Sequence, residues 1–194
     1  MIYVVSGYMR TGTSMMMQAL TAGGLKAVFE ETRNDIVTAR YSDKHYHPNQ
    51  QGIYELHLRT MLKLFQEPAL IEGKLVKCLS GGIVHLGAWK WKLVFMERSY
   101  EEIRQSCLAF FGGANQVGTE DDFKKRMKFA QDLMDVRSDM EWIKLQYRDV
   151  VANPRKTFQL LKDQGWPIDV SKAAEIPRKS KVRYRFENLQ VGIV

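Results

Sequence analysis

The sequence predicts a three-layer α/β/α fold, in which a mostly parallel central sheet is covered by helices on both faces. Short apolar runs rich in β-branched residues alternate along the chain with longer segments of helical period. The first of these runs ends in a glycine-bearing turn that leads directly into a helical segment. Short apolar strands that alternate with helices are typical of a parallel sheet buried between two helical layers.

The first half of the chain contains three predicted strands and two predicted helices. The strands are expected at 2–6, 27–29 and 74–78, and the helices at 14–23 and 53–65. The first helix closes on a pair of glycines, Gly23-Gly24, which is a common stop signal. Residues 30–51 show no sustained period, so we expect an ordered functional loop there.

The second half continues the alternation. Strands are expected at 92–96 and 142–147, helices at 100–111 and 121–140, and a last helix opens at Asn153-Pro154. Ligands of parallel α/β sheets bind outside the carboxyl ends of the strands. The turns after Ser6, Phe29, Cys78 and Met96 are therefore expected to converge on one crevice.

Length and composition favour one domain over residues 1–194, with a basic C-terminal segment at 177–194. Apolar residues make up 45% of the chain, but no run approaches the roughly 20 needed to span a bilayer. We therefore expect no membrane association and a cytoplasmic location. Cys78 and Cys107 lie among apolar neighbours, which favours reduced core thiols over a disulfide or a metal site.

The formal net charge of +7 favours anionic partners without choosing among them. One basic cluster, at 124–128, falls on a helical pattern and is interpreted as a solvated face. A second cluster, at 178–185, is denser and interleaved with aromatic residues.

The turn at residues 7–14, Gly-Tyr-Met-Arg-Thr-Gly-Thr-Ser, departs from the triphosphate-binding pattern G-x-x-x-x-G-K-[ST] at one position. Thr13 stands where that pattern has lysine, and Arg10 is the nearby cation. Free N–H groups and the helix dipole at the start of the following helix favour an anion. The turn is therefore predicted to hold a phosphate whose charge Arg10 helps to neutralise.

Four segments together resemble the sulfotransferase family. Residues 7–14 resemble its 5′-phosphosulfate loop, and Arg98 with Ser106 resembles its 3′-phosphate pair. Residues 145–154 and 47–55 are similar to the family's Arg-Tyr-Glu-Asp-Leu-Val-x-x-Pro and Asn-Pro-x-Gly-x-x-Glu stretches. The resemblance implies a P-loop NTPase-like sulfotransferase fold and 3′-phosphoadenosine 5′-phosphosulfate as the donor, which leaves as 3′,5′-adenosine bisphosphate.

The resemblance also implies roles for individual residues. Donor contacts would come from Arg10, Thr11, Gly12, Thr13 and Ser14 at the 5′ end, Arg98 and Ser106 at the 3′-phosphate, and Tyr147 near the adenine. Many family members close a basic segment over the donor at the position that Arg178 and Lys179 occupy here. A solvated tail is the alternative interpretation of those two residues.

Sulfuryl transfer needs a base for the acceptor hydroxyl and cations for the developing charge. Phe29-Glu30-Glu31-Thr32-Arg33 resembles the Gly-Glu-Glu-Thr-Arg segment of tyrosylprotein sulfotransferases, which implies Glu31 as the base. Lys77 matches the strand-end lysine of those enzymes and would bind the sulfonate. We expect Arg33, His47 and Glu55 to contact the acceptor, with His45, His47 and Glu55 as rival bases. No metal is expected.

The predicted activity is in-line transfer of a sulfonate to a hydroxyl acceptor, which the sequence leaves open between a peptide tyrosine, a sugar, a lipid and a small molecule. One alternative is a P-loop kinase or nucleotide-binding protein. The other is a non-catalytic module that binds anions or nucleic acid through the positive charge, and nucleic acid is the less favoured of these partners.

Overall fold

The computed structural model describes residues 1–32, 35, 54–111 and 117–180 of the chain. Within them, five parallel strands form one sheet in the order β2-β3-β1-β4-β5. The strands are β1 (Ile2–Gly7), β2 (Ala27–Val28), β3 (Leu75–Lys77), β4 (Trp91–Glu97) and β5 (Met140–Gln146). The prediction of an α/β fold with a parallel central sheet is thus confirmed.

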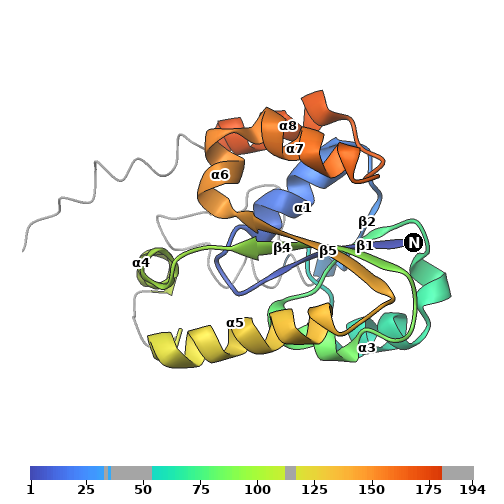
Figure 1. Ribbon diagram of the computed structural model, residues 1–194, viewed down its shortest axis with the longest axis horizontal. Helices are drawn as coiled ribbons and strands as arrows, with labels where there is room; N and C mark the ends of the chain where they lie inside the picture. Colours follow the sequence, from blue (N-terminus) through green and yellow to red (C-terminus); the bar gives the residue numbers. More distant parts are fainter. Residues whose placement is uncertain (33–34, 36–53, 112–116, 181–194) are drawn as a thin grey trace, which may run out of the picture.

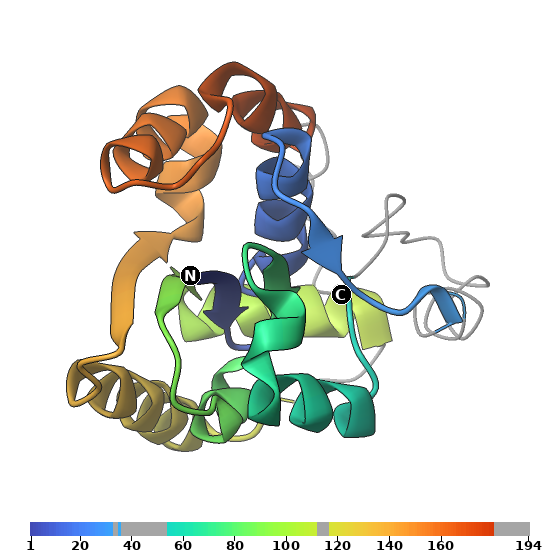
Figure 2. The same cartoon turned by 90° about the vertical axis from the view of Figure 1, so that its right-hand side faces the viewer.

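Helices cover both faces of this sheet (Figure 1). One layer contains α1 (Thr13–Ala22), α6 (Tyr147–Ala152), α7 (Pro154–Asp163) and α8 (Val170–Ser180). The other contains α3 (Leu58–Gln66), α5 (Glu120–Asp135) and the 3₁₀ turns η1 (Pro68–Ile71) and η2 (Ser80–His85). Figure 2 shows the two layers from the side. Helix α4 (Tyr100–Phe111) lies beyond the carboxyl end of β4.

The core is divided by the sheet into two halves because successive side chains of a strand point to opposite faces. Val4 of β1 joins the cluster under α3 and α5, whereas its neighbour Val5 joins the cluster under α1, α7 and α8. Burying a side chain of this size contributes about 1.5–3 kcal/mol relative to leaving it exposed. Both thiols, Cys78 and Cys107, are free and buried, as predicted. Burial raises the pKa of the Cys78 thiol to about 12.

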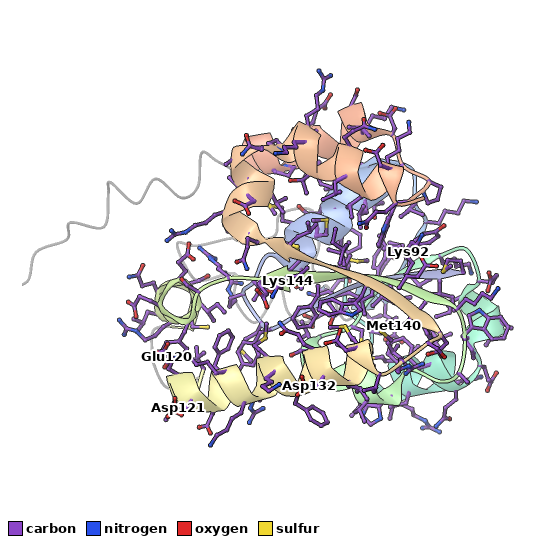
Figure 3. All side chains as sticks on the ribbon, in the orientation of Figure 1. Lys92, Glu120, Asp121, Asp132, Met140 and Lys144 are labelled. Atoms are coloured by element: carbon purple, nitrogen blue, oxygen red, sulfur yellow. The ribbon has the colours of Figure 1, made fainter. Side chains whose placement is uncertain are left out.

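The basic cluster at 124–128 occupies the exposed side of α5, as predicted. Lys124 pairs with Glu120 and Lys128 with Asp132, each at 2.9 Å, along this helix. Figure 3 labels both acidic partners. The cluster is therefore a solvated face, and exposed ion pairs of this kind contribute little to stability.

Several element boundaries differ from the prediction. Helix α5 ends at Asp135, because Arg137 turns back to bind Asp139 and the carbonyl oxygens of Leu86 and Gly87. Strand β5 consequently begins at Met140. The second predicted helix begins late, at Leu58, because the Glu30 carboxylate accepts hydrogen bonds from the His57 N–H and the Thr60 hydroxyl.

The C-terminal part of the described chain also differs. The helix that opens at Pro154 is not the last one, since α8 follows it, and α8 continues through Pro177 to Ser180. The segment at 177–180 therefore belongs to a helix and not to a tail. Pro177 is buried and Ala173 and Ala174 pack in the core, so burial against α1 outweighs the low helix propensity of proline.

Candidate functional site

The loop between β1 and α1 has a backbone that its glycines make possible. Gly7 and Gly12 have φ angles of +141° and +97°. A Cβ on Gly7 would lie 2.5 Å from the Met96 carbonyl oxygen, so only glycine fits between β1 and β4. The Thr11 hydroxyl donates to the Tyr8 carbonyl at 2.7 Å and closes the turn from inside. Arg10, at its tip, also has a positive φ, 66°, which is uncommon outside glycine.

Helix α1 starts immediately after this turn, with Gly12 as its N-cap. No side chain of the N-cap satisfies the first N–H groups, since glycine has none. These groups and the helix dipole face the loop and favour an anion there. Thr11 and Thr13 are buried in the loop and the first turn.

Three groups predicted to serve the two ends of a nucleotide come together beside this helix start. Arg10 Nε donates to Ser106 Oγ of α4 at 3.1 Å. Arg98, which follows β4, donates from Nη1 to the carbonyl oxygen of Arg10 at 3.3 Å. Residues separated by about 90 positions in the chain therefore form one basic cluster, defined here as the arginine cluster of Arg10, Arg98 and Ser106.

Tyr147, which follows the fifth strand directly, lies against this cluster. The Arg98 guanidinium lies over its ring, 4.4 Å from the centroid, which is a cation–π distance. A Cβ on Gly12 would lie 2.6 Å from Cδ2 of the same ring. Tyr147 therefore packs between the loop and Arg98. Its position explains this contact: as the first residue of α6, it lies just past the carboxyl end of β5, at the edge of the sheet where the loop and Arg98 also lie.

Glu102 is a further member of the site that the resemblance did not indicate. Its buried carboxylate accepts hydrogen bonds from the Ser99 N–H, the Ser99 hydroxyl and Arg148 Nε, and it lies 3.8 Å from Arg98 Nε. Burial would raise the pKa of Glu102, but the bonds from Ser99 and Arg148 and the Arg98 charge lower it overall. The signal in the sequence was the capping box Ser99-x-x-Glu102.

Lys77 occupies the carboxyl end of β3, next to β1, on the other side of the loop. Its Nζ donates to Ser14 Oγ in the first turn of α1 at 3.1 Å and lies 3.2 Å from Glu55 Oε1. The Lys77 side chain is only 5% exposed. Burial lowers the pKa of Lys77, the Glu55 carboxylate opposes that shift, and the Arg10 charge adds to it.

The acceptor side is described only in part. Glu31 is exposed in a short helical turn after β2, while the neighbouring Glu30 is engaged with α3. Glu55 lies at Lys77. Arg33, His45 and His47 lie outside the described residues. Arg178 and Lys179 fall in the last turn of α8. The roles predicted for all of these residues stay predictions.

The described part of the chain contains neither a candidate membrane span nor a candidate metal site. No helix within 1–32, 54–111 or 117–180 is long and apolar enough to cross a membrane. No group of three or more His, Cys, Asp or Glu side chains in that part of the chain is arranged to hold a metal ion.

Comparison with known proteins gives a likeness of fold alone. No family model matches the chain, and no curated protein matches it in sequence. Among solved structures, a sulfotransferase from Mycobacterium tuberculosis H37Rv has a TM-score of 0.52 at 14% identity, over 92% of this chain and 70% of that one. An unliganded sugar kinase from Janibacter sp. HTCC2649 has a TM-score of 0.46 at 12% identity, over 89% and 96%. The chain thus has a P-loop-like α/β fold similar to that of a sulfotransferase.

Proposed function

We propose that this protein transfers a sulfonate from 3′-phosphoadenosine 5′-phosphosulfate to a hydroxyl acceptor. The observation that carries the proposal is the arginine cluster, in which Arg10 of the glycine loop bonds to Ser106 and Arg98 bonds to the loop backbone. A donor with phosphates on both the 5′ and the 3′ oxygens needs two adjacent anion sites. The loop with the α1 N-terminus suits the first, and Arg98 with Ser106 suits the second.

The remaining residues fit the same donor. Tyr147 offers a ring face beside Arg98 for an adenine, because aromatic rings stack on bases. Lys77 adds a positive charge at Ser14, on the side of the loop opposite to Arg98. Thr11, Thr13 and Ser14 bring hydroxyl groups to the 5′ end. Arg98 and Lys77 thus provide positive charge on both sides of the loop, although no lysine follows Gly12.

In the proposed reaction, the acceptor oxygen attacks sulfur as its proton passes to the Glu31 carboxylate. A new O–S bond forms, the S–O bond to the 5′-phosphate breaks, and adenosine 3′,5′-bisphosphate leaves with the bonding electron pair. Arg10 and Lys77 stabilise the charge that accumulates on the sulfonate and phosphate oxygens. The acceptor is a hydroxyl compound whose class the described residues leave open between peptide, sugar, lipid and small metabolite.

Phosphoryl transfer from ATP by the same kind of loop is the alternative. A kinase would require ATP with magnesium to bind more tightly than nucleotides that carry a 3′-phosphate. The two functions therefore predict opposite orders of ligand affinity.

A thermal-shift panel distinguishes them. We expect 3′,5′-adenosine bisphosphate to raise the melting temperature more than ADP, AMP or ATP with magnesium does, since only the bisphosphate carries the 3′-phosphate. A ligand at a hundredfold its Kd adds about 2.7 kcal/mol to stability, which is readily measured. Equal shifts for the bisphosphate and AMP, or a larger one for ATP with magnesium, would remove the donor assignment.

Arg98→Ala sharpens the test, with Arg104→Ala as its matched control. Arg98→Ala should weaken bisphosphate binding by roughly 2–4 kcal/mol and change AMP binding little, because a charge-assisted phosphate contact is lost. Arg104 lies on α4 and pairs with Glu101 at the surface, so its loss should leave both affinities unchanged. Titration calorimetry on both variants, after their melting temperatures are compared, measures the difference.

A further inference from the structure

Lys77 lies in an arrangement that the donor proposal does not explain by itself. Its ammonium lies between a hydroxyl and a carboxylate, 3.1 Å from Ser14 Oγ and 3.2 Å from Glu55 Oε1. The three groups come from three separate parts of the chain: the end of β3, the first turn of α1 and the segment before α3. The fold therefore brings a buried cation to the start of the helix that faces the glycine loop.

This is the place where P-loop enzymes hold a different cation. In the pattern G-x-x-x-x-G-K-[ST], the final hydroxyl binds a magnesium ion, which an acidic residue also holds. Ser14 stands at the position of that hydroxyl, since Gly7 and Gly12 take the two glycine positions. In this chain the partner of the hydroxyl is an ammonium group, and the acidic residue, Glu55, is bound to that ammonium.

We propose that Lys77, held by Glu55, is the built-in cation of this site and performs at Ser14 the charge neutralisation that magnesium performs in P-loop kinases and hydrolases. Glu55 is then a positioning residue, which acts through Lys77. The inference deepens the proposed function and rests on it for the identity of the donor, but the metal-independent binding of a 5′-phosphate follows from Lys77 alone.

Burial explains why the pair is needed. A buried ammonium is costly unless a charged partner and hydrogen bonds compensate for the lost water. Burial lowers the pKa of Lys77, and the charges that face it among the described residues act in opposite directions: the Glu55 carboxylate raises the pKa and the Arg10 guanidinium lowers it. Glu55 thus keeps Lys77 charged in a basic site, and it fixes the direction in which Nζ points.

The first experiment measures AMP and 3′,5′-adenosine bisphosphate binding by calorimetry, with magnesium and with EDTA. We expect the wild-type affinities to be the same in both buffers. Lys77→Met should weaken both ligands by about tenfold or more, because a charge-assisted contact to the shared 5′-phosphate is lost. Lys74→Met is the matched control. Lys74 precedes the same strand, is exposed and donates from Nζ to the Leu70 carbonyl of η1, so the affinities of this variant should equal those of the wild type.

The second experiment uses Glu55→Gln, which keeps the shape of the side chain. Without the carboxylate, the Lys77 pKa falls further, so the ammonium loses its proton at a lower pH. As the pH rises above neutrality, bisphosphate affinity of the variant should therefore begin to decline at a lower pH than that of the wild type. The 5′-phosphate itself is already dianionic there, since its second pKa is about 6. A merely structural role would lower the melting temperature without changing this pH profile.

The outcomes separate the two proposals. If AMP and the bisphosphate bind equally but both depend on Lys77 and not on magnesium, the donor assignment fails and the built-in cation stands. Binding that requires magnesium in the wild type, unchanged affinity in Lys77→Met, or parallel pH profiles of Glu55→Gln and the wild type would each overturn the built-in cation.

Discussion

Gly12 shows at the residue scale how closely the loop is packed. Its φ of +97° lies in the left-handed region, and a Cβ there would lie 2.6 Å from the Tyr147 ring. Gly24 has a similar φ of +111°, but a Cβ on it would meet no atom within 4 Å. The two glycines therefore separate the effect of backbone strain from the effect of crowding.

Gly12→Ala should consequently cost more than Gly24→Ala. Both substitutions should lower the free energy of unfolding by about 1–2 kcal/mol, because alanine is placed in the left-handed region. Gly12→Ala should lower it by about 1–3 kcal/mol more, because the new Cβ overpacks against Tyr147. Because Tyr147 supports Arg98, only Gly12→Ala should also weaken bisphosphate binding. Chemical denaturation and calorimetry on both variants measure these differences, and equal losses of stability would contradict the contact.

Glu31 is tested by a substitution that preserves its size. We expect Glu31→Gln to retain bisphosphate binding while turnover slows by about 100-fold or more, as when a positioned base is removed from an intact site. Thr32→Ala, beside it in the same exposed turn, is the control and should change turnover little. The measurement is sulfonate transfer from labelled donor to a panel of hydroxyl acceptors. If the Glu31→Gln variant is active and the His47→Ala variant is inactive, His47 and not Glu31 is the base.

At the scale of elements, the start of α4 links helix stability to the arginine cluster. Ser99 and Glu102 form a capping box, in which the Glu102 carboxylate accepts from the Ser99 N–H and the Ser99 hydroxyl faces the Glu102 N–H at 3.4 Å. The same carboxylate lies beside Arg98, and α4 carries Ser106. The box thus fixes both the helix and the two groups proposed to bind the 3′-phosphate.

This carboxylate should make the stability of the protein sensitive to acid. The folded-state pKa of Glu102 lies below that of a free glutamate, about 4.3, so its contribution is present above that pH and is lost as pH falls through the folded value. We expect Glu102→Gln to lower stability by about 1–3 kcal/mol at neutral pH and to flatten the decline between about pH 5 and pH 3. Glu141→Gln, which removes an exposed carboxylate that pairs with Lys92, is the control. Melting curves across this range that decline in parallel for Glu102→Gln and the wild type would contradict the role.

Two helices show where tertiary contacts override the local sequence pattern. The helix at 58–66 starts where Glu30 binds His57 and Thr60, a contact between segments almost 30 residues apart. Helix α8 passes through Pro177 because the helix, with Pro177 itself buried, packs against α1. In both cases a tertiary contact outweighs the local preference on which the sequence prediction depended.

At the scale of the whole molecule, strand order creates the site. Because β1 lies between β3 and β4, the strand-end residues Lys77 and Arg98 reach the glycine loop from opposite sides. A parallel sheet places all of these carboxyl ends at one edge, and the order of strands decides which ends are neighbours. The basic residues at 181–185 lie outside the described part of the chain, and their predicted closure over the donor stays a prediction.

The sequence by itself determined the alternation of strands and helices, the glycine loop and the residue types at the strand ends, because periodicity and turn chemistry are local properties. It also carried the resemblance that pairs Arg98 with Ser106. Only the tertiary structure decided that Arg10 bonds to Ser106, that Arg148 bonds to Glu102 and that Glu55 binds Lys77 against Ser14. These contacts join residues brought together by the order and register of the strands, which no local pattern records.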